Sequence, residues 1–130
     1  MIGIIVTGHI HFATGIKSAL EAILGKKQCV EYVDFTEGLT RKELETSLLE
    51  ACAKVDKGEG ILFCTDVPSG TPFQVAAQIC TDKKPSAVLT GSNLSLLTEA
   101  VMERDSFKNI SDLAAHVTEA GRQAIQSISF

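Results

Sequence analysis

The sequence has little of what marks fibrous, disordered or disulfide-rich proteins. Its 130 residues include only three prolines and four cysteines, and it has no low-complexity segment. Hydrophobic residues make up 45% of the chain and charged residues 22%, a balance typical of globular domains. A collagen-like fibre, a disulfide scaffold and a disordered tail are therefore excluded. A length of 130 residues predicts a single domain, residues 1–130, with enough chain to bury a core.

Long apolar runs and clustered positive charge are also missing. No apolar run approaches the roughly 20 residues that a membrane-spanning helix needs. The apolar residues 2–6 have no basic region before them, so we expect a strand there and not a signal peptide. Lysines and arginines are scattered, and the formal net charge is -4. Because nucleic-acid-binding proteins usually carry a basic stripe, this pattern argues against DNA or RNA as a partner.

The cysteines show no pairing that suggests a metal or redox site. No C-x-x-C motif occurs among the four of them, which are Cys29, Cys52, Cys64 and Cys80. With no export signal in view, we expect buried, reduced thiols and a cytoplasmic protein.

Short β-branched runs alternate with helical periodicity along the whole chain. We expect strands over residues 2–7, 29–35, 60–65 and 85–90, the second of them nearer an edge. The first helix should bury an apolar stripe and stop at Gly25; the stripe consists of Ile16, Ala19, Leu20, Ile23 and Leu24. The second should begin with a capping box from Thr40 to Glu43 and bury Leu44, Leu48, Cys52 and Val55.

Three further helices follow from the same kind of pattern. Thr71 is a good helix N-cap, with Pro72 at the first helical position. Leu94, Leu97 and Val101 mark a fourth helix, and Ser111 is a candidate cap for a last one carrying Leu113, Val117 and Ala120. Beyond it, Ile128 and Phe130 alternate like an edge strand.

Four repeats of strand and helix predict an α/β, doubly wound three-layer fold with a four-stranded parallel sheet. Ligands in such sheets bind beyond the carboxyl ends of the strands. The loops to examine are therefore residues 8–13, 66–71 and 91–93.

Two side chains with complementary chemistry lie at this edge. His9 follows the first strand directly, and Asp66 stands at the same end of the third, so we expect them to meet. A carboxylate bonded to one ring nitrogen fixes the imidazole tautomer and leaves the other nitrogen as a nucleophile. Taken separately, His9 could equally be an ordinary loop histidine and Asp66 a helix-capping residue.

An anion cradle is expected beside this pair. Ser69, Gly70 and Thr71 lead into a helix N-terminus, where free backbone N–H groups and a partial positive charge favour a phosphoryl group. A histidine nucleophile, an orienting aspartate and a phosphate cradle together indicate reversible phosphoryl transfer.

Other interpretations of the same residues stay open. His9-Ile10-His11 could be half of a metal site with Asp66 as third ligand, although no further His or Cys lies in the neighbouring loops. Ser69 could complete a hydrolase triad with His9 and Asp66, but no G-x-S-x-G elbow exists. No G-x-G-x-x-G motif supports a dinucleotide site. His116 is expected on the surface, or half-buried, on the last helix.

The chain resembles the IIA component of the mannose-type family of the bacterial sugar phosphotransferase system. The resemblance runs over essentially the whole chain, and its most specific part is the Asp66-x-x-x-Gly-Thr-Pro-Phe73 stretch. The matching segments are residues 1–9 (MIGIIVTGH), 12–15 (FATG), 60–66 (GILFCTD), 69–73 (SGTPF), 91–93 (GSN) and 97–104.

The resemblance implies a role for each site residue. His9 corresponds to the histidine that carries phosphate on Nε2, Asp66 to the aspartate that bonds its Nδ1, and Thr71 to a hydroxyl near the phosphoryl group. Phosphate arrives from the phosphocarrier HPr and goes to a IIB component, which serves the membrane proteins IIC and IID. Neither metal nor cofactor is required, because the energy is already in the N–P bond. Family members are homodimers that exchange a C-terminal strand.

Two departures from the family pattern and two rival functions remain. Ile10 stands where the family usually has glycine, and Ser69 replaces the first of two glycines. Because β-branched residues disfavour positive φ, we expect a differently shaped loop at Ile10. The rivals are the phosphoryl-transfer subunit of a dihydroxyacetone kinase and a non-enzymatic module that senses a ligand in the same cleft.

Overall fold

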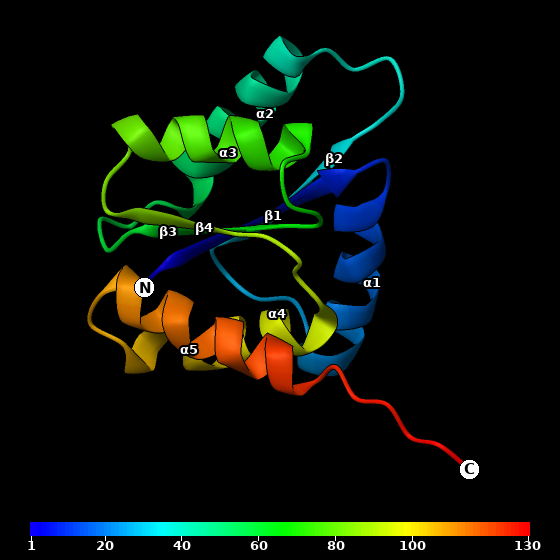
Figure 1. Ribbon diagram of the computed structural model, residues 1–130. Helices are drawn as coiled ribbons and strands as arrows, with labels where there is room; N and C mark the ends of the chain where they lie inside the picture. Colours follow the sequence, from blue (N-terminus) through cyan, green and yellow to red (C-terminus); the bar gives the residue numbers. More distant parts are fainter.

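Four strands form one parallel sheet in the computed structural model, which describes residues 1–130 (Figure 1). The predicted strand ranges agree with it to within two residues at each end. Along the sheet the order is β2-β1-β3-β4, and all three pairings are parallel. The strands are β1 (Gly3–His9), β2 (Val30–Phe35), β3 (Ile61–Thr65) and β4 (Ser86–Leu89).

Burial follows the strand order. In the two central strands, β1 and β3, every residue except His9 is buried, as expected for strands covered on both faces. Every residue of β2 and β4 is partly buried, because each of these strands has a neighbour on one side only. The prediction that the second strand lies at an edge is confirmed.

Helices cover both faces of the sheet (Figure 1). Helices α1 (Phe12–Leu24), α4 (Leu94–Glu103) and α5 (Ile110–Gln123) pack on one face over the larger apolar cluster, with the short 3₁₀ helix η1 (Arg104–Ser106) after α4. Helices α2 (Arg41–Val55) and α3 (Thr71–Asp82) pack on the other. The predicted doubly wound three-layer architecture is confirmed. None of these helices combines the length and the hydropathy needed to cross a bilayer.

The helix ends agree with the sequence in some places and differ in others. At α2 the predicted capping box between Thr40 and Glu43 is present, with both reciprocal hydrogen bonds formed. At α3 the N-cap is Gly70, so the predicted cap Thr71 is the first helical residue. At α5 the cap is Asn109, whose carboxamide accepts from the Asp112 N–H, and Ser111 lies inside the helix. In both errors the observed cap lies before the predicted one, by one residue at α3 and by two residues at α5.

Two further expectations concern burial, one for Ile23 and one for the cysteines. Ile23, predicted on the buried stripe of α1, is 56% exposed, because α1 packs through Ala13 and Leu20. All four cysteines are free thiols, but only Cys52 and Cys64 are buried, whereas Cys29 and Cys80 are partly exposed. Burial raises the pKa of Cys64 to about 12. After α5 the chain leaves the body as a tail that forms no strand, visible in red in Figure 1.

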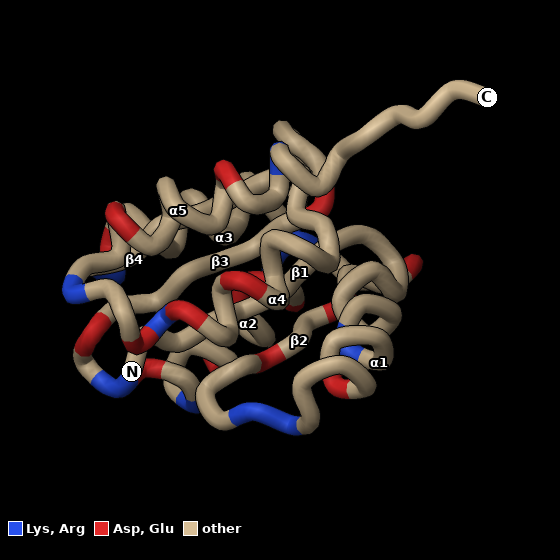
Figure 2. Tube along the Cα trace, turned by 90° about the horizontal axis from the view of Figure 1, so that it is seen from below, with Lys and Arg blue, Asp and Glu red and all other residues tan.

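Charged residues of both signs are interspersed along the chain. Figure 2 shows Lys and Arg scattered among Asp and Glu over helices and loops. This distribution agrees with the scattered basic residues noted in the sequence. It offers no extended basic stripe of the kind that binds a phosphodiester backbone.

Candidate functional site

The carboxyl edge of the sheet brings three candidate side chains together. His9 is the last residue of β1, and Asp66 directly follows β3, its neighbour in the sheet. On the other side of β1, Asp34 of β2 stands opposite Gly8. His9 therefore lies between two acidic strand ends, only one of which sequence reasoning had selected.

His9 and Asp66 form a close pair. The Oδ2 atom of Asp66 accepts a hydrogen bond from the His9 backbone N–H at 2.8 Å and lies 2.8 Å from Nδ1 of the His9 ring. Its Oδ1 accepts from the Val67 N–H at 2.9 Å. The carboxylate is 10% exposed and the imidazole 45% exposed. The acid is thus enclosed while the ring that it holds faces solvent.

Electrostatics at Asp66 determine the tautomer of His9. Burial would raise the pKa of Asp66, but the hydrogen bonds from His9 and Val67 outweigh it and hold that pKa below its ordinary value. An ionised carboxylate can only accept hydrogen bonds, so Nδ1 of His9 must carry the proton. The lone pair of the neutral ring then lies on Nε2, at the solvent side.

Two glycines make room for this pair. A Cβ atom on Gly70 would lie 2.6 Å from Cε1 and 3.3 Å from Nε2 of His9. A Cβ atom on Gly8 would lie 2.6 Å from the Phe12 ring and 2.9 Å from Cγ of Asp66. The edge of the His9 ring therefore lies directly over the start of α3. The sequence pointed to Gly70 but not to Gly8, since a close approach of this kind has no local sequence signal.

The start of α3 presents donors to the space beside His9. The N–H groups of Thr71 and Phe73 have no backbone carbonyl as acceptor, as at other helix N-termini. Ser69 has a φ of 64°, a left-handed conformation that turns the chain into the helix. Gln74 holds this turn through a hydrogen bond from Nε2 to the Ser69 carbonyl, and Arg41 of α2 donates to the Gln74 carboxamide.

Ile10 has a positive φ, the conformation that we expected isoleucine to avoid. Its φ is 52°, so the β-branched residue occupies the left-handed region that suits glycine. The expectation that isoleucine would avoid a positive φ here is wrong. A hydrogen bond from the Ile10 N–H to the Phe35 carbonyl, at 2.8 Å, holds the backbone in place. The Ile10 side chain is 48% exposed beside His9.

The two neighbouring histidines bind different acids, which bears on the metal interpretation. His9 contacts Asp66, whereas His11 contacts Asp34 through Nδ1 at 3.2 Å. No group of three or more His, Cys, Asp or Glu side chains is arranged to hold a metal ion. The structure therefore does not form the metal-ligand set that the His-x-His motif allowed, which consists of His9, His11 and Asp66.

Two other sequence candidates, the loop of residues 91–93 and His116, lie away from His9. In the loop of residues 91–93, Asn93 caps α4 and donates to the Gly121 carbonyl of α5. His116 is 41% exposed on α5, with Nε2 2.7 Å from Glu99, as the sequence suggested for a surface histidine. Ser69 lies near the ring, and Asp66 at Nδ1 is where a hydrolase triad would place its acid. No hydrogen bond joins the Ser69 hydroxyl to Nε2 of His9, so the nucleophile contact of such a triad is not formed.

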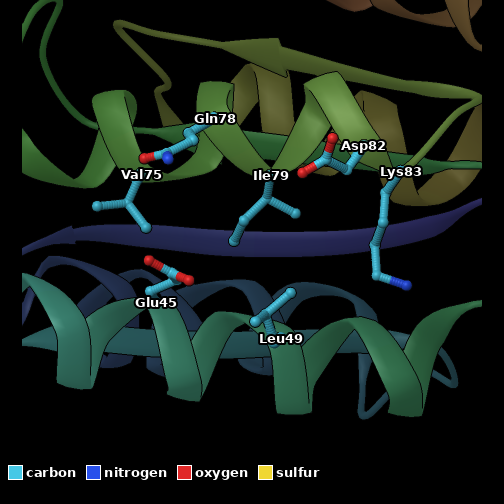
Figure 3. Close-up of a pocket in the computed structure, with 7 residues that line it drawn as sticks. All are labelled: Glu45, Leu49, Val75, Gln78, Ile79, Asp82 and Lys83. Atoms are coloured by element: carbon cyan, nitrogen blue, oxygen red, sulfur yellow. The ribbon is translucent and has the colours of Figure 1, made fainter.

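A groove of about 210 Å³ lies between α2 and α3, away from the histidine (Figure 3). Figure 3 shows Leu49 from α2 facing Val75 and Ile79 from α3 across its floor. Its full lining is Glu45, Leu49, Val75, Gln78, Ile79, Asp82 and Lys83. Neither His9 nor Asp66 is among these residues, so the groove is separate from the exposed His9 ring.

Comparison with known proteins identifies relatives of the same kind over nearly the whole chain. The family model EIIA-man, described as PTS system fructose IIA component, matches residues 3–118. The mannose-specific EIIAB component of Escherichia coli K12 is 31% identical over 127 residues, 98% of this chain. This chain spans 39% of that longer protein. The sorbose-specific EIIA component of Lacticaseibacillus casei is 30% identical, covering 97% of this chain and 90% of the relative.

Solved structures agree with the sequence relatives. The phosphotransferase system component EIIA from Streptococcus agalactiae superposes with a TM-score of 0.90 at 32% identity, covering 98% of this chain and 97% of the other. These matches favour the sugar phosphotransferase interpretation over a dihydroxyacetone kinase subunit or a sensing module. The chain belongs to the EIIA-man family of PTS system fructose IIA components.

Proposed function

We propose that residues 1–130 form a single IIA domain that carries phosphoryl groups in a sugar phosphotransferase system. The domain accepts a phosphoryl group from the phosphocarrier HPr on Nε2 of His9 and passes it to a IIB component. The observation that carries this proposal is the 2.8 Å contact between Nδ1 of His9 and Asp66, which leaves Nε2 free. Family membership supports the same activity.

The geometry supports a direct displacement at phosphorus. The Nε2 lone pair of neutral His9 attacks the phosphorus of the donor phosphohistidine, and the donor N–P bond breaks. Its electron pair stays on the donor ring. Positive charge then develops on His9, and the adjacent Asp66 carboxylate stabilises it through the Nδ1–H hydrogen bond. Transfer to the IIB component is the same step in reverse, with His9 as the leaving group.

The start of α3 supports the transferred group. The free N–H groups of Thr71 and Phe73, with the positive end of the helix, suit the phosphoryl oxygens. The Thr71 hydroxyl is a further donor, and Ser69 and Gly70 shape the turn that brings the helix against the ring. We assign these three residues to phosphoryl binding.

The partners follow from this role. HPr and a IIB component use the His9 face in turn, while the membrane proteins IIC and IID act only through IIB. The protein therefore works in the cytoplasm. The two relatives described above are specific for mannose and for sorbose. We further propose that the chain is a homodimer in which its C-terminal tail is exchanged.

A reconstituted transfer reaction tests the proposal. The chain is incubated with phosphoenolpyruvate, enzyme I and HPr, and the modified residue is mapped by mass spectrometry under alkaline conditions. We expect acid-labile phosphate on His9 that moves to a IIB component on its addition. Absence of phosphate from His9 would overturn the proposal.

Two variants define the roles within the pair. His9→Gln should abolish transfer to IIB, and Asp66→Asn should keep the fold but slow the loading of His9. His116→Gln is the matched control, because this histidine lies on α5 with its Nε2 bound to Glu99. An unchanged loading rate in Asp66→Asn would remove Asp66 from the mechanism.

A further inference from the structure

A second histidine–aspartate pair lies on the same loop as His9. Nδ1 of His11 is 3.2 Å from Oδ2 of Asp34. The same carboxylate accepts from the Thr14 backbone N–H at 3.0 Å and from its hydroxyl at 2.7 Å. Asp34 is therefore held by the first turn of α1, while its other contact orients the His11 ring.

The two pairs share one construction. Asp66 follows β3 and Asp34 lies in β2, the two strands that flank β1 in the sheet. Each carboxylate accepts a backbone N–H and contacts Nδ1 of one imidazole. In both pairs the bond uses Nδ1, so Nε2 is the nitrogen directed away from the acid. His11 thus has the feature on which the proposed role of His9 depends.

Charge at Asp34 supports the same tautomer for His11. Burial would raise the pKa of Asp34, but hydrogen bonds from Thr14 and His11 outweigh it and lower that pKa below its ordinary value. The carboxylate is 16% exposed, against 71% for the His11 side chain. An ionised Asp34 accepts the Nδ1 proton, which leaves the lone pair of neutral His11 on a solvent-facing Nε2.

His116 shows that this arrangement is not common to every histidine here. Its Nε2 lies 2.7 Å from Glu99 and is therefore engaged. Its ring packs against Phe107, with the ring centroids 5.0 Å apart. Of the three histidines, only His9 and His11 combine an acid at Nδ1 with a free Nε2 at the carboxyl edge of the sheet.

We propose that Nε2 of His11 is a second phosphoryl acceptor, loaded by the same phosphohistidine donor that loads His9. The inference rests on the proposed function, because it takes the donor from it. The Nε2 lone pair of His11 forms a bond to phosphorus as the donor N–P bond breaks, and the electron pair of that bond stays on the donor ring. The Nδ1 proton of His11 is retained and shared with Asp34.

The decisive experiment uses the His9→Gln variant, in which the first acceptor is absent. The variant and the wild type are incubated with phosphoenolpyruvate, enzyme I and HPr, and phosphorylated peptides are mapped at alkaline pH. We expect acid-labile phosphate on His11 of the variant and none on the His9→Gln, His11→Gln double variant. A variant without phosphate on His11, alongside a wild type phosphorylated on His9, would overturn the second site alone.

Two further comparisons separate a true acceptor from a reactive surface imidazole. Asp34→Asn in the His9→Gln background keeps an oxygen for the Thr14 N–H but removes the charge behind His11, so labelling of His11 should fall at least severalfold. His116→Gln in the same background should leave it unchanged. Equal labelling of His11 in the Asp34→Asn and parent variants would contradict the role given to the pair. A wild type with no phosphate on His9 would instead overturn the proposed function.

Discussion

At the scale of single residues, the position of the His9 ring depends on the side chain that Gly70 lacks. The backbone of Gly70 has φ -77° and ψ 167°, a conformation that alanine adopts without strain. A methyl group there would nevertheless lie 2.6 Å from Cε1 of His9. Glycine is therefore needed at this position because a side chain would clash with the His9 ring, and not because of the backbone conformation. A substitution can test this clash without disturbing the backbone.

We expect Gly70→Ala to retain the fold and to lower the rate of phosphoryl transfer about 100-fold, because small displacements of a reacting group cost this much. The measurement is the loading rate of His9 from phospho-HPr, with circular dichroism as the check on folding. Gly15→Ala is the matched control, since a Cβ atom on Gly15 meets nothing within 4 Å. Equal loading rates in the two variants would show that the contact has no role.

At the residue scale, the pKa of Asp66 also predicts how the stability of the protein depends on pH. Its pKa in the folded chain lies below the ordinary value of 3.8, chiefly through the hydrogen bonds that outweigh burial. The unfolded chain therefore binds the proton more readily. The stability that the carboxylate contributes is complete above the unfolded pKa and is lost as pH falls through the folded one.

The free energy of unfolding of wild type and Asp66→Asn should accordingly differ most at neutral pH. We expect the difference to be level down to about pH 5 and to shrink below about pH 4. Urea titrations of both proteins at several pH values measure it. A difference that stays constant into the acid range would mean that the ionised form of Asp66 gives the fold no advantage.

At the scale of elements, two helices begin with the same residue type in different surroundings. Asn93 caps α4 by accepting from the Leu96 N–H and also donates to the Gly121 carbonyl of α5 at 3.0 Å. Asn109 caps α5 by accepting from the Asp112 N–H, while its other bond goes to an exposed side chain of the same turn. Only the first cap joins two helices.

Replacing each cap with alanine should separate these contributions. We expect Asn109→Ala to lower the free energy of unfolding by about 1 kcal/mol, the usual value of an N-cap. Asn93→Ala should lower it by about 2 kcal/mol, since a partly buried hydrogen bond between helices is lost as well. Urea denaturation gives both values. Equal losses would indicate that the bond to Gly121 adds nothing.

At the scale of the whole molecule, the C-terminal tail stays exposed in the single chain. Ile125 and Ile128 are 77% and 74% exposed, although burial of each side chain would be worth about 2 kcal/mol. The tail extends from α5 without joining the sheet. A second copy of the chain would give these side chains a surface on which to pack.

Deleting residues 125–130 should therefore convert the proposed dimer into a monomer. Sedimentation equilibrium at several concentrations measures the molar mass, and the double variant Ile125→Ser, Ile128→Ser in the full chain is the control for length. We expect both proteins to be monomers that still accept phosphate, because His9, Asp66 and α3 belong to one chain. A wild type that is itself monomeric would contradict the exchange of the tail.

Much of this architecture could be predicted from local pattern. Strand and helix types, the capping box at Thr40, the stop at Gly25 and the edge position of β2 depend on residues close together in the chain. The same reasoning placed His9 and Asp66 at one edge, since parallel strands end on the same side. The errors at Thr71 and Ser111 arose where two residues within two positions of each other were both plausible caps.

The sequence by itself thus determined the fold class, the edge at which we propose the chemistry and the two residues proposed to perform it. Only the tertiary structure decided that His11 pairs with Asp34, that Gly8 and Gly70 make room for the site, and that Ile10 takes a positive φ. These features depend on strand order and on close approaches between distant segments. Periodicity reports which face of an element is buried, but it carries no information about which atoms meet there.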